Sequence, residues 1–306
     1  MKLTTAIMKA LFDFDDLTRD RALSMPIDVV RFTNITYGTK RPYQQLDVYH
    51  PAEEFMHHFT NEHGEIPVIV SVHGGGWIHG SKDTYQYYCM DMARRGFAVV
   101  NFSYGLAPQY KFPVFLEDTV QAFDWVYVHA RQYNFDTHHV YAIGDSAGAN
   151  ILGLYCALAT NSQFAQRIKF DVYRAHVPQA IALSCGVYKT DIKHDKKHTQ
   201  TMQDDLYSDV FEPYGKYSQR FLMNVTDYVT ESFPPTLVIT STGDFLQMQA
   251  PLLVHALQKA HVPVKFTIYG TQEDKDKYPH VFHLDIKSTR AMKCNDDQIE
   301  FFRQHS

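Results

Sequence analysis

The chain has 306 residues, of which 45% are hydrophobic and 21% charged, a size and composition suited to a globular α/β protein with a large core. Its formal net charge of −5 and its pI of about 6.4 argue against nucleic acid or an anionic membrane as a partner. No uninterrupted apolar run is long enough to cross a bilayer, so we expect no membrane partner. The length suits a single domain over residues 1–306.

The N-terminal residues 1–12 carry Lys2 and Lys9 among short, broken apolar runs. This pattern predicts an amphipathic helix and not a signal peptide, because no cleavage site of small residues follows. A cytoplasmic location is therefore expected. The cysteines form no Cys-x-x-Cys pair, which indicates buried free thiols and no metal site. They are Cys89, Cys156, Cys185 and Cys294.

Eight segments have the composition of β-strands. The first two alternate apolar and polar residues around a turn containing Gly38, which is typical of a hairpin, and the next two are nearly all apolar, as buried parallel strands are. Helical patterns at residues 82–95, ended by Gly96, and at 113–133 lie between strands. The eight strand segments are residues 29–36, 45–49, 67–72, 98–103, 140–143, 180–184, 236–240 and 264–269.

Alternation of strands and helices predicts a mostly parallel eight-stranded sheet with helices on both faces. In such a fold the functional groups lie at the carboxyl ends of the strands. Two segments, residues 1–25 and about 188–233, do not fit the alternation. An insertion as long as the second is uncommon without a function. Both are therefore predicted to form a small cap over the site.

The sequence Gly144-Asp-Ser-Ala-Gly148 lies between a strand-like run and a helical run. A Gly-x-Ser-x-Gly sequence in this context is the nucleophile elbow, a tight turn that holds a strained serine clear of the sheet edge. Ser146 is the candidate nucleophile. The residue after it, Ala147, is expected to offer its N–H group to a developing oxyanion.

A run of three glycines, His73-Gly-Gly-Gly-Trp77, directly follows the strand segment that ends at Val72. Such a run leaves backbone N–H groups free to point at one spot, which is the requirement for an oxyanion hole. Its order and spacing relative to the elbow favour this interpretation over a flexible turn. Gly75 and Gly76 are the candidate donors.

A serine nucleophile needs a base, and the base needs an orienting acid; in an elbow-type fold they follow in the order serine, acid, histidine. Asp244 follows the strand segment 236–240, and Glu273, Asp274 and Asp276 in a later charged loop are alternatives. Two histidines compete as the base in the segment that leads out of the loop after the last strand. His280 is favoured because it lies at the end of a loop, whereas His283 is one turn further on and is expected to face solvent or the cap.

Four motifs together resemble the α/β-hydrolase carboxylesterases of the hormone-sensitive-lipase-like group, over a stretch from about residue 29 to the C-terminus. They are His73–Trp77, Asn101–Pro108, Phe112–Asp118 and Gly144–Gly148. The resemblance implies the α/β-hydrolase fold, esterase activity on small acyl esters, no cofactor, and a cap from N-terminal and inserted segments. By position it implies Ser146 as nucleophile, Asp244 as acid, His280 as base, and an oxyanion hole from Gly75, Gly76 and Ala147.

The chain departs from the pattern of this group at several positions. Gly105 and Gln109 stand where an arginine and a glutamate are usual, so a structural ion pair is expected to be missing. Phe245 replaces the proline of the usual Asp-Pro-Leu, and Val281 replaces the glycine of the usual His-Gly-Phe. None of these changes removes a catalytic atom.

The predicted function is that of a serine carboxylesterase acting on short-chain or small aromatic acyl esters, with Trp77 and an aromatic cap lining the substrate site. An amidase such as an arylformamidase is an alternative, and a non-catalytic small-molecule-binding homologue is a weaker one. The expected partner is a small-molecule ester. Many esterases of this group dimerise, so a homodimer is a further expectation, although no segment marks an interface.

Overall fold

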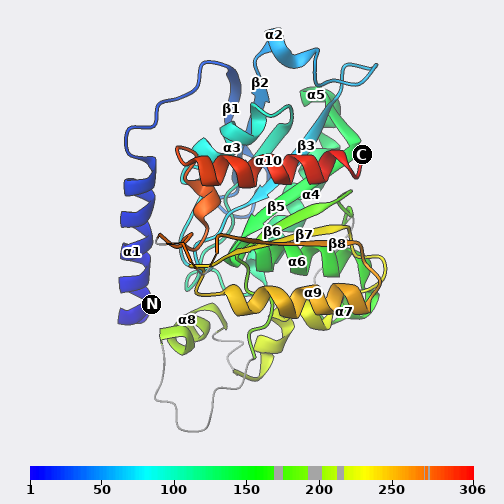
Figure 1. Cartoon of the computed structure of the whole chain (residues 1–306). Helices are drawn as coiled ribbons and strands as arrows, with labels where there is room; N and C mark the ends of the chain where they lie inside the picture. Colours follow the sequence, from blue (N-terminus) through cyan, green and yellow to red (C-terminus); the bar gives the residue numbers. More distant parts are fainter. Residues whose placement is uncertain (169–174, 192–201, 212–216, 272, 275) are drawn as a thin grey trace.

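The computed structural model describes residues 1–306 except 169–174, 192–201, 212–216, 272 and 275. Its described part contains one eight-stranded sheet in the order β1-β2-β4-β3-β5-β6-β7-β8 (Figure 1). Strand β2 runs antiparallel to β1 and β4, and all other neighbours are parallel. The strands are β1 (Val29–Thr36), β2 (Gln45–Pro51), β3 (Ile66–Val72), β4 (Ala98–Phe102), β5 (Phe135–Asp145), β6 (Ile181–Ser184), β7 (Thr236–Ser241) and β8 (Val264–Tyr269). The predicted fold class is confirmed.

Helices cover both faces of this sheet, as its nearly continuous apolar strands require. The helices are α1 (Leu3–Asp20), α2 (Glu53–Met56), α3 (Gln86–Ala93), α4 (Val114–Val128), α5 (Ala130–Tyr133), α6 (Ala147–Thr160), α7 (Ser162–Ile168), α8 (Met202–Phe211), α9 (Ala250–Lys259) and α10 (Thr289–Arg303). Short 3₁₀ helices are η1 (Tyr217–Met223), η2 (Val225–Asp227), η3 (Gln247–Gln249) and η4 (Phe282–Leu284).

The core has two halves because alternate strand residues point to opposite faces. Val68 and Val70 pack with side chains of α4, α6 and α9, whereas Ile69 between them packs with side chains of α3 and α10. All three side chains are fully buried. This double cover fixes the strand register, and with it the edge at which the loops carrying Ser146, Asp244 and the glycine run come together.

Two predicted helices differ from the observed ones at their ends. The helix predicted over 82–95 begins only at Gln86, because Ser81 and Thr84 side chains bond to backbone N–H groups and hold residues 81–84 in a turn. The helix predicted over 113–133 is divided at His129 into α4 and α5. The four cysteines are buried and free, as predicted.

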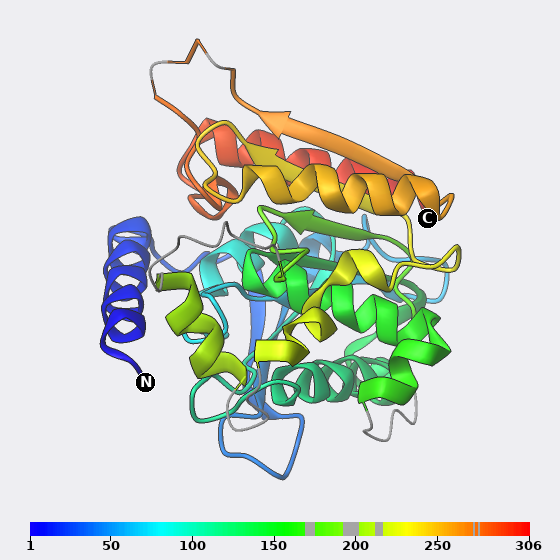
Figure 2. The same cartoon turned by 90° about the horizontal axis from the view of Figure 1, so that it is seen from below.

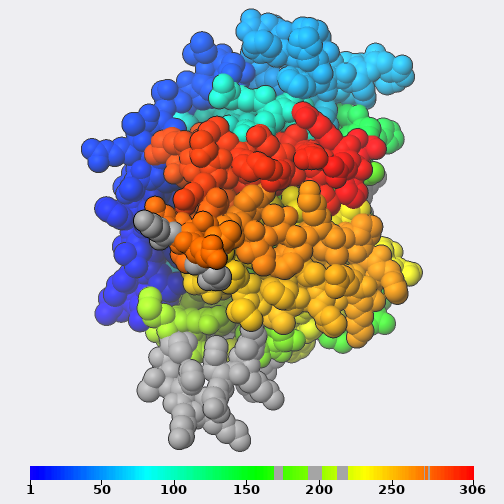
Figure 3. Space-filling model, in the orientation of Figure 1, coloured from blue at the N-terminus to red at the C-terminus, as the bar shows by residue number. Residues whose placement is uncertain are grey.

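The N-terminal amphipathic helix is present and extends to Asp20 as α1. In the two cartoon views it stands along one edge of the molecule beside α8 (Figures 1 and 2). Lys2 N donates to Asp209 Oδ2 at 2.9 Å and Thr4 Oγ1 to Asp205 Oδ2 at 2.6 Å, which joins the two helices. The space-filling view shows the same N-terminal segment lying against the body (Figure 3). No described helix is both long and apolar enough to cross a membrane.

The segments predicted as a cap, residues 1–25 and 188–233, contain α1, α8, η1 and η2. Residues 192–201 and 212–216 of the second segment lie outside the described residues. A cap function for α1 and α8 therefore stays a prediction.

Candidate active site

Ser146 lies in the tight turn between the end of β5 and the start of α6. Its backbone has φ 50° and ψ −117°, a region that side chains rarely adopt, and its N–H donates to Ser184 O at 2.9 Å. A Cβ at Gly144 would lie 2.7 Å from Gly148 O, and one at Gly148 would collide with Val72 O. Only glycine allows β3, β5 and α6 to approach this closely.

His280 and Asp244 continue from Ser146 in one hydrogen-bonded series. His280 Nε2 lies 3.0 Å from Ser146 Oγ, and His280 Nδ1 lies 2.6 Å from Asp244 Oδ1. The serine and the histidine are 134 positions apart in the sequence. The structure thus brings together the three residues that the sequence predicted as nucleophile, acid and base.

The Asp244 carboxylate is held by further donors. Thr240 Oγ1 donates to Oδ2 at 2.8 Å and Leu246 N donates to Oδ1 at 2.9 Å. Burial raises the pKa of this carboxyl, but the hydrogen bond and charge of His280 and the two other donors outweigh burial and lower it below its usual value. Asp244 is therefore an anion whose position is fixed on both oxygens.

The alternative residues of the sequence analysis lie elsewhere. His283 is buried in η4, its ring packs against Tyr88, and burial lowers its pKa to about 3. The expectation that it would face solvent or the cap is wrong, because the turn at Val281 (φ 51°) directs it into the core. Among the alternative acids, Asp274 accepts a hydrogen bond from Thr271 N in its own loop. Of the described carboxylates, only that of Asp244 is within hydrogen-bonding distance of His280.

The glycine run forms a compact loop beside the elbow. Gly75 and Gly76 have φ of 101° and 59°, and Gly75 O accepts from Ile78 N at 3.1 Å and His79 N at 3.0 Å. Within the described part of the chain, no acceptor lies on the N–H groups of Gly75, Gly76 or Ala147. These three donors are therefore free to bind a ligand oxygen.

Two tyrosines that sequence reasoning missed hold this loop in place. Tyr85 OH accepts from Gly74 N at 2.8 Å and donates to Asp145 Oδ2 at 2.7 Å, which joins the loop to the elbow. Burial raises the pKa of Asp145 to about 7. Tyr104 OH donates to His73 O at 2.8 Å, and its ring stacks on the imidazole of His73 at 3.9 Å. Asp145 and Tyr104 lie inside motifs that the sequence showed, but no local pattern identified Tyr85.

The glycine loop also contacts the helices of the predicted cap. His79 Nε2 lies 2.8 Å from Asp16 Oδ2 of α1, and His79 Nδ1 lies 3.3 Å from Asp13 Oδ1. A Cβ at Gly76 would lie 3.5 Å from Phe12 Cε2 and 3.8 Å from Leu206 Cδ2. Helices α1 and α8 therefore flank the residues that present the free N–H groups.

Trp77, predicted to line the substrate site, is 2% exposed and packs against Tyr207 of α8 with ring centroids 6.1 Å apart. Its substrate role stays a prediction.

At the position where Gly105 replaces the usual arginine, Gly105 N donates to Asp118 Oδ2 and Arg41 Nη1 donates to Asp118 Oδ1, both at 2.9 Å. Asp118 is thus paired with a cation from another part of the chain, while positions 105 and 109 themselves carry no charged pair.

One group of described residues has the ligand types of a metal site: Cys185, Asp244 and His280, whose ligand atoms all lie within 4.8 Å of one another. Asp244 and His280 already bond each other, and burial raises the pKa of the Cys185 thiol and keeps it protonated. The arrangement therefore fits a hydrogen-bonded series better than a metal centre.

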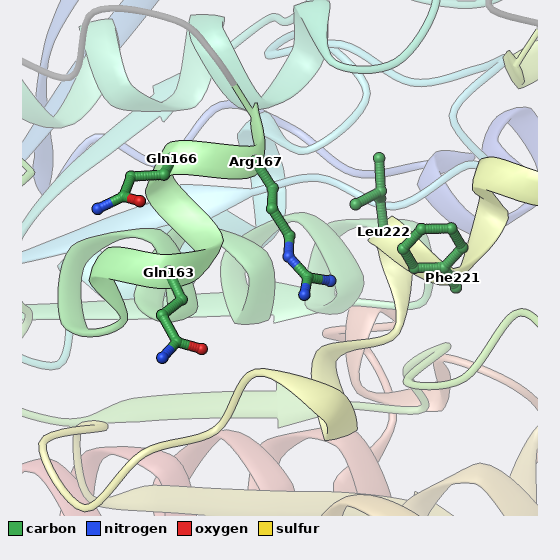
Figure 4. Close-up of a pocket in the computed structure, with 5 residues that line it drawn as sticks. All are labelled: Gln163, Gln166, Arg167, Phe221 and Leu222. Carbon is green, nitrogen blue, oxygen red and sulfur yellow. The ribbon is translucent and has the colours of Figure 1, made fainter.

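A separate surface hollow lies between α7 and η1. Figure 4 shows its lining residues, with Gln163, Gln166 and Arg167 on one helix and Phe221 and Leu222 on the facing segment. None of these side chains belongs to the hydrogen-bonded series at Ser146. None of its lining side chains offers a hydroxyl, thiol, carboxylate or imidazole, whereas a serine and a histidine are hydrogen-bonded at the elbow.

Comparison with known proteins gives a family match, described as the alpha/beta hydrolase fold, over residues 69–284. A protein of Acanthamoeba polyphaga mimivirus, described as an alpha/beta hydrolase, is 27% identical over 217 residues, which are 68% of this chain and 61% of that protein. The versiconal hemiacetal acetate esterase of Dothistroma septosporum is 29% identical over 246 residues, 75% of this chain and 70% of the esterase. The chain thus spans about three-fifths of the length of the mimivirus relative.

The fold also matches solved structures over nearly the whole chain. Esterase B from Lactobacillus rhamnosis, crystallised with a tributyrin phosphonate inhibitor, superposes with a TM-score of 0.85 at 22% identity and covers 99% of this chain and 95% of its own. At this level of identity the likeness concerns the fold.

Proposed function

The chain belongs to the alpha/beta hydrolase fold family, and we propose that it is a serine carboxylesterase of the hormone-sensitive-lipase-like group. The observation that carries this proposal is the unbroken hydrogen-bonded series from Ser146 Oγ through His280 to Asp244. A strained serine on an elbow, a histidine within reach and a buried anion behind it are the parts of a nucleophilic hydrolase. A non-catalytic homologue would have no need for all three.

The reaction proceeds through an acyl-enzyme. His280 Nε2 takes the proton of Ser146 Oγ as the oxygen attacks the ester carbonyl, and the tetrahedral oxyanion forms. Collapse breaks the bond to the alcohol oxygen, which leaves with the proton from His280. Water, deprotonated by His280, then attacks the acyl-enzyme and releases the acid. Asp244 accepts from His280 Nδ1–H throughout, which selects the productive tautomer and stabilises the imidazolium.

The free N–H groups of Gly75, Gly76 and Ala147 are the proposed oxyanion hole. They need no reorganisation during the reaction, because the Tyr85–Asp145 hydrogen bond and the bonds to Gly75 O already shape the loop. The charge that develops on the carbonyl oxygen is therefore stabilised where it appears.

Short-chain or small aromatic acyl esters are the proposed substrates. Phe12 and Leu206 lie beside Gly76, and the ring of the next residue, Trp77, packs against Tyr207. These apolar side chains limit the room for an acyl chain on that side of the oxyanion hole. The name of the Dothistroma septosporum relative specifies an acetate ester, which is consistent with a short acyl group. We extend the proposal to a small-molecule substrate and to α1 and α8 as the cap.

The acyl preference is tested with p-nitrophenyl esters from acetate to decanoate, measured beside a matched N-formyl anilide. We expect kcat/KM to fall steadily beyond butanoate, because longer chains meet the buried rings of Trp77 and Tyr207. Trp77→Ala should move the optimum toward longer chains. A decanoate optimum in the wild type would contradict a short acyl site, and faster turnover of the anilide than of every ester would indicate an amidase.

We predict that Asp16→Asn lowers kcat about three- to tenfold and leaves KM nearly unchanged. Asp16 contacts the imidazole of His79, and the backbone N–H of His79 donates to Gly75 O. Loss of the carboxylate charge therefore loosens the loop that presents the oxyanion donors. Asp15→Asn is the matched control, because Asp15 is an exposed neighbour on α1. Steady-state kinetics of both variants decide the point. Equal kcat in the two would show that the Asp16 carboxylate does not act on the loop.

A further inference from the structure

Phe245 is an exposed aromatic side chain placed directly against the proposed base. Its ring centroid lies 4.3 Å from that of His280 with an interplanar angle of 43°, and the residue is 75% exposed. A single exposed apolar side chain is ordinary on a protein surface, so what distinguishes Phe245 is the contact of its ring with His280. The phenylalanine also stands where the resembling group usually has proline, so it is a feature of this chain.

The backbone around Phe245 is rigid although its side chain is exposed. Asp244 N donates to Ser241 O at 3.2 Å, Leu246 N donates to Asp244 Oδ1 at 2.9 Å, and Gln247 N donates to Asp244 O at 3.1 Å. These bonds hold residues on both sides of Phe245. The main chain of Phe245 is therefore fixed beside Asp244, and binding against the ring would order only the side-chain torsions of this residue.

The position of the ring relative to His280 indicates which half of an ester it meets. His280 Nε2 gives its proton to the departing alcohol oxygen, which must lie within about 3 Å of that nitrogen. The acyl carbonyl oxygen, in contrast, faces Gly75, Gly76 and Ala147. A substituent on the alcohol oxygen extends away from these donors and along the imidazole, and the ring of Phe245 packs against that imidazole with centroids 4.3 Å apart.

We propose that Phe245 determines specificity for the alcohol half of the substrate and favours esters of aromatic alcohols. This inference rests on the proposed esterase function and adds the chemistry of the leaving group, which the acyl site does not define. A flat apolar ring against Phe245 gains buried apolar area and an aromatic contact, and an ethyl group gains much less.

Phe245 has a second conceivable effect, which is to keep water away from the His280–Asp244 hydrogen bond. Shielding of that bond would change the turnover of all esters by a similar factor, because the base acts in every case. Contact with the leaving group changes the ratio between alcohols instead. The ratio is therefore the measurement that separates a specificity-determining residue from a shielding one.

The experiment compares kcat/KM for benzyl acetate and ethyl acetate in the wild type and in Phe245→Ala, Phe245→Pro and Phe245→Tyr. The two alcohols leave with similar acidity, so the ratio reports contact and not leaving-group chemistry. We expect the benzyl-to-ethyl ratio to fall about three- to tenfold in the alanine and proline variants and to return in the tyrosine variant. Met248→Ala, another exposed apolar side chain nearby, serves as the control with an unchanged ratio.

The acyl side is checked with ethyl acetate against ethyl butanoate, whose ratio should stay constant in every Phe245 variant. An unchanged benzyl-to-ethyl ratio in Phe245→Ala would overturn the inference while leaving the esterase proposal intact. A change of the acetate-to-butanoate ratio instead would place Phe245 on the acyl side and equally overturn it. Absence of ester hydrolysis in the wild type would overturn both proposals.

Discussion

Ser146→Ala should lower kcat/KM for p-nitrophenyl acetate about 10³- to 10⁶-fold and leave the fold intact. The hydroxyl is the only group on the elbow that can form the acyl bond, and among the described residues no other hydroxyl is hydrogen-bonded to His280. The methyl group of alanine fits where the Cβ already lies. Residual hydrolysis would come from the oxyanion donors and substrate binding alone.

The measurement combines steady-state kinetics, circular dichroism and labelling by an alkyl phosphonate, which bonds covalently to an activated serine. The variant should resist labelling and keep the spectrum and the melting temperature of the wild type within a few degrees. Activity above about one-tenth of the wild-type value would show that Ser146 is not the nucleophile. A collapsed spectrum would identify a folding defect instead.

Asp244→Asn should lower kcat by about 10³- to 10⁴-fold at neutral pH, with a smaller change in KM. An amide in place of the carboxylate can present its NH₂ group to His280 Nδ1, which favours the tautomer that carries its proton on Nε2. The ring then cannot accept the serine proton, and the imidazolium loses its counter-charge. Thr240 Oγ1 still finds an acceptor in the amide oxygen at the Oδ2 position, whereas Leu246 N, which shares Oδ1 with His280, loses its own. One of the two bonds that hold the loop therefore remains.

Asp274→Asn is the matched control for this variant, because that carboxylate belongs to the charged loop and bonds Thr271 N. It should retain nearly all activity. A loss in Asp274→Asn as large as that in Asp244→Asn would reassign the acid.

The same carboxylate predicts a dependence of stability on pH. The pKa of Asp244 is lowered in the folded protein, so its contribution to stability is present above the unfolded pKa of about 3.9 and is lost as pH falls through the folded value. Chemical unfolding of wild type and Asp244→Asn should therefore show stabilities that converge as the pH is lowered below about 4. A difference that grows toward acid pH would contradict a lowered pKa.

Features that depend on neighbouring residues could be predicted from the sequence alone. The elbow around Ser146 and the loop at Gly75 and Gly76 are short motifs whose glycines allow close backbone approaches or a positive φ. The strand segments carry their own apolar patterns, so the sheet and its eight strands were predictable as well. The ends of helices were harder to predict, because the side-chain hydrogen bonds around Ser81 and the break at His129 interrupt the helical pattern.

Features that depend on distant residues were decided by the tertiary structure. The position of His280 at the end of a loop favoured it over His283, but the place of each ring is set by the left-handed backbone at Val281, with His280 bonded to Asp244 and His283 in the core. The contact of Asp16 with His79 and the pairing of Arg41 with Asp118 likewise join segments with no common pattern. Local motifs are set by sterics within a few residues, whereas these contacts arise only when the register of the sheet brings the loops at its carboxyl edge together.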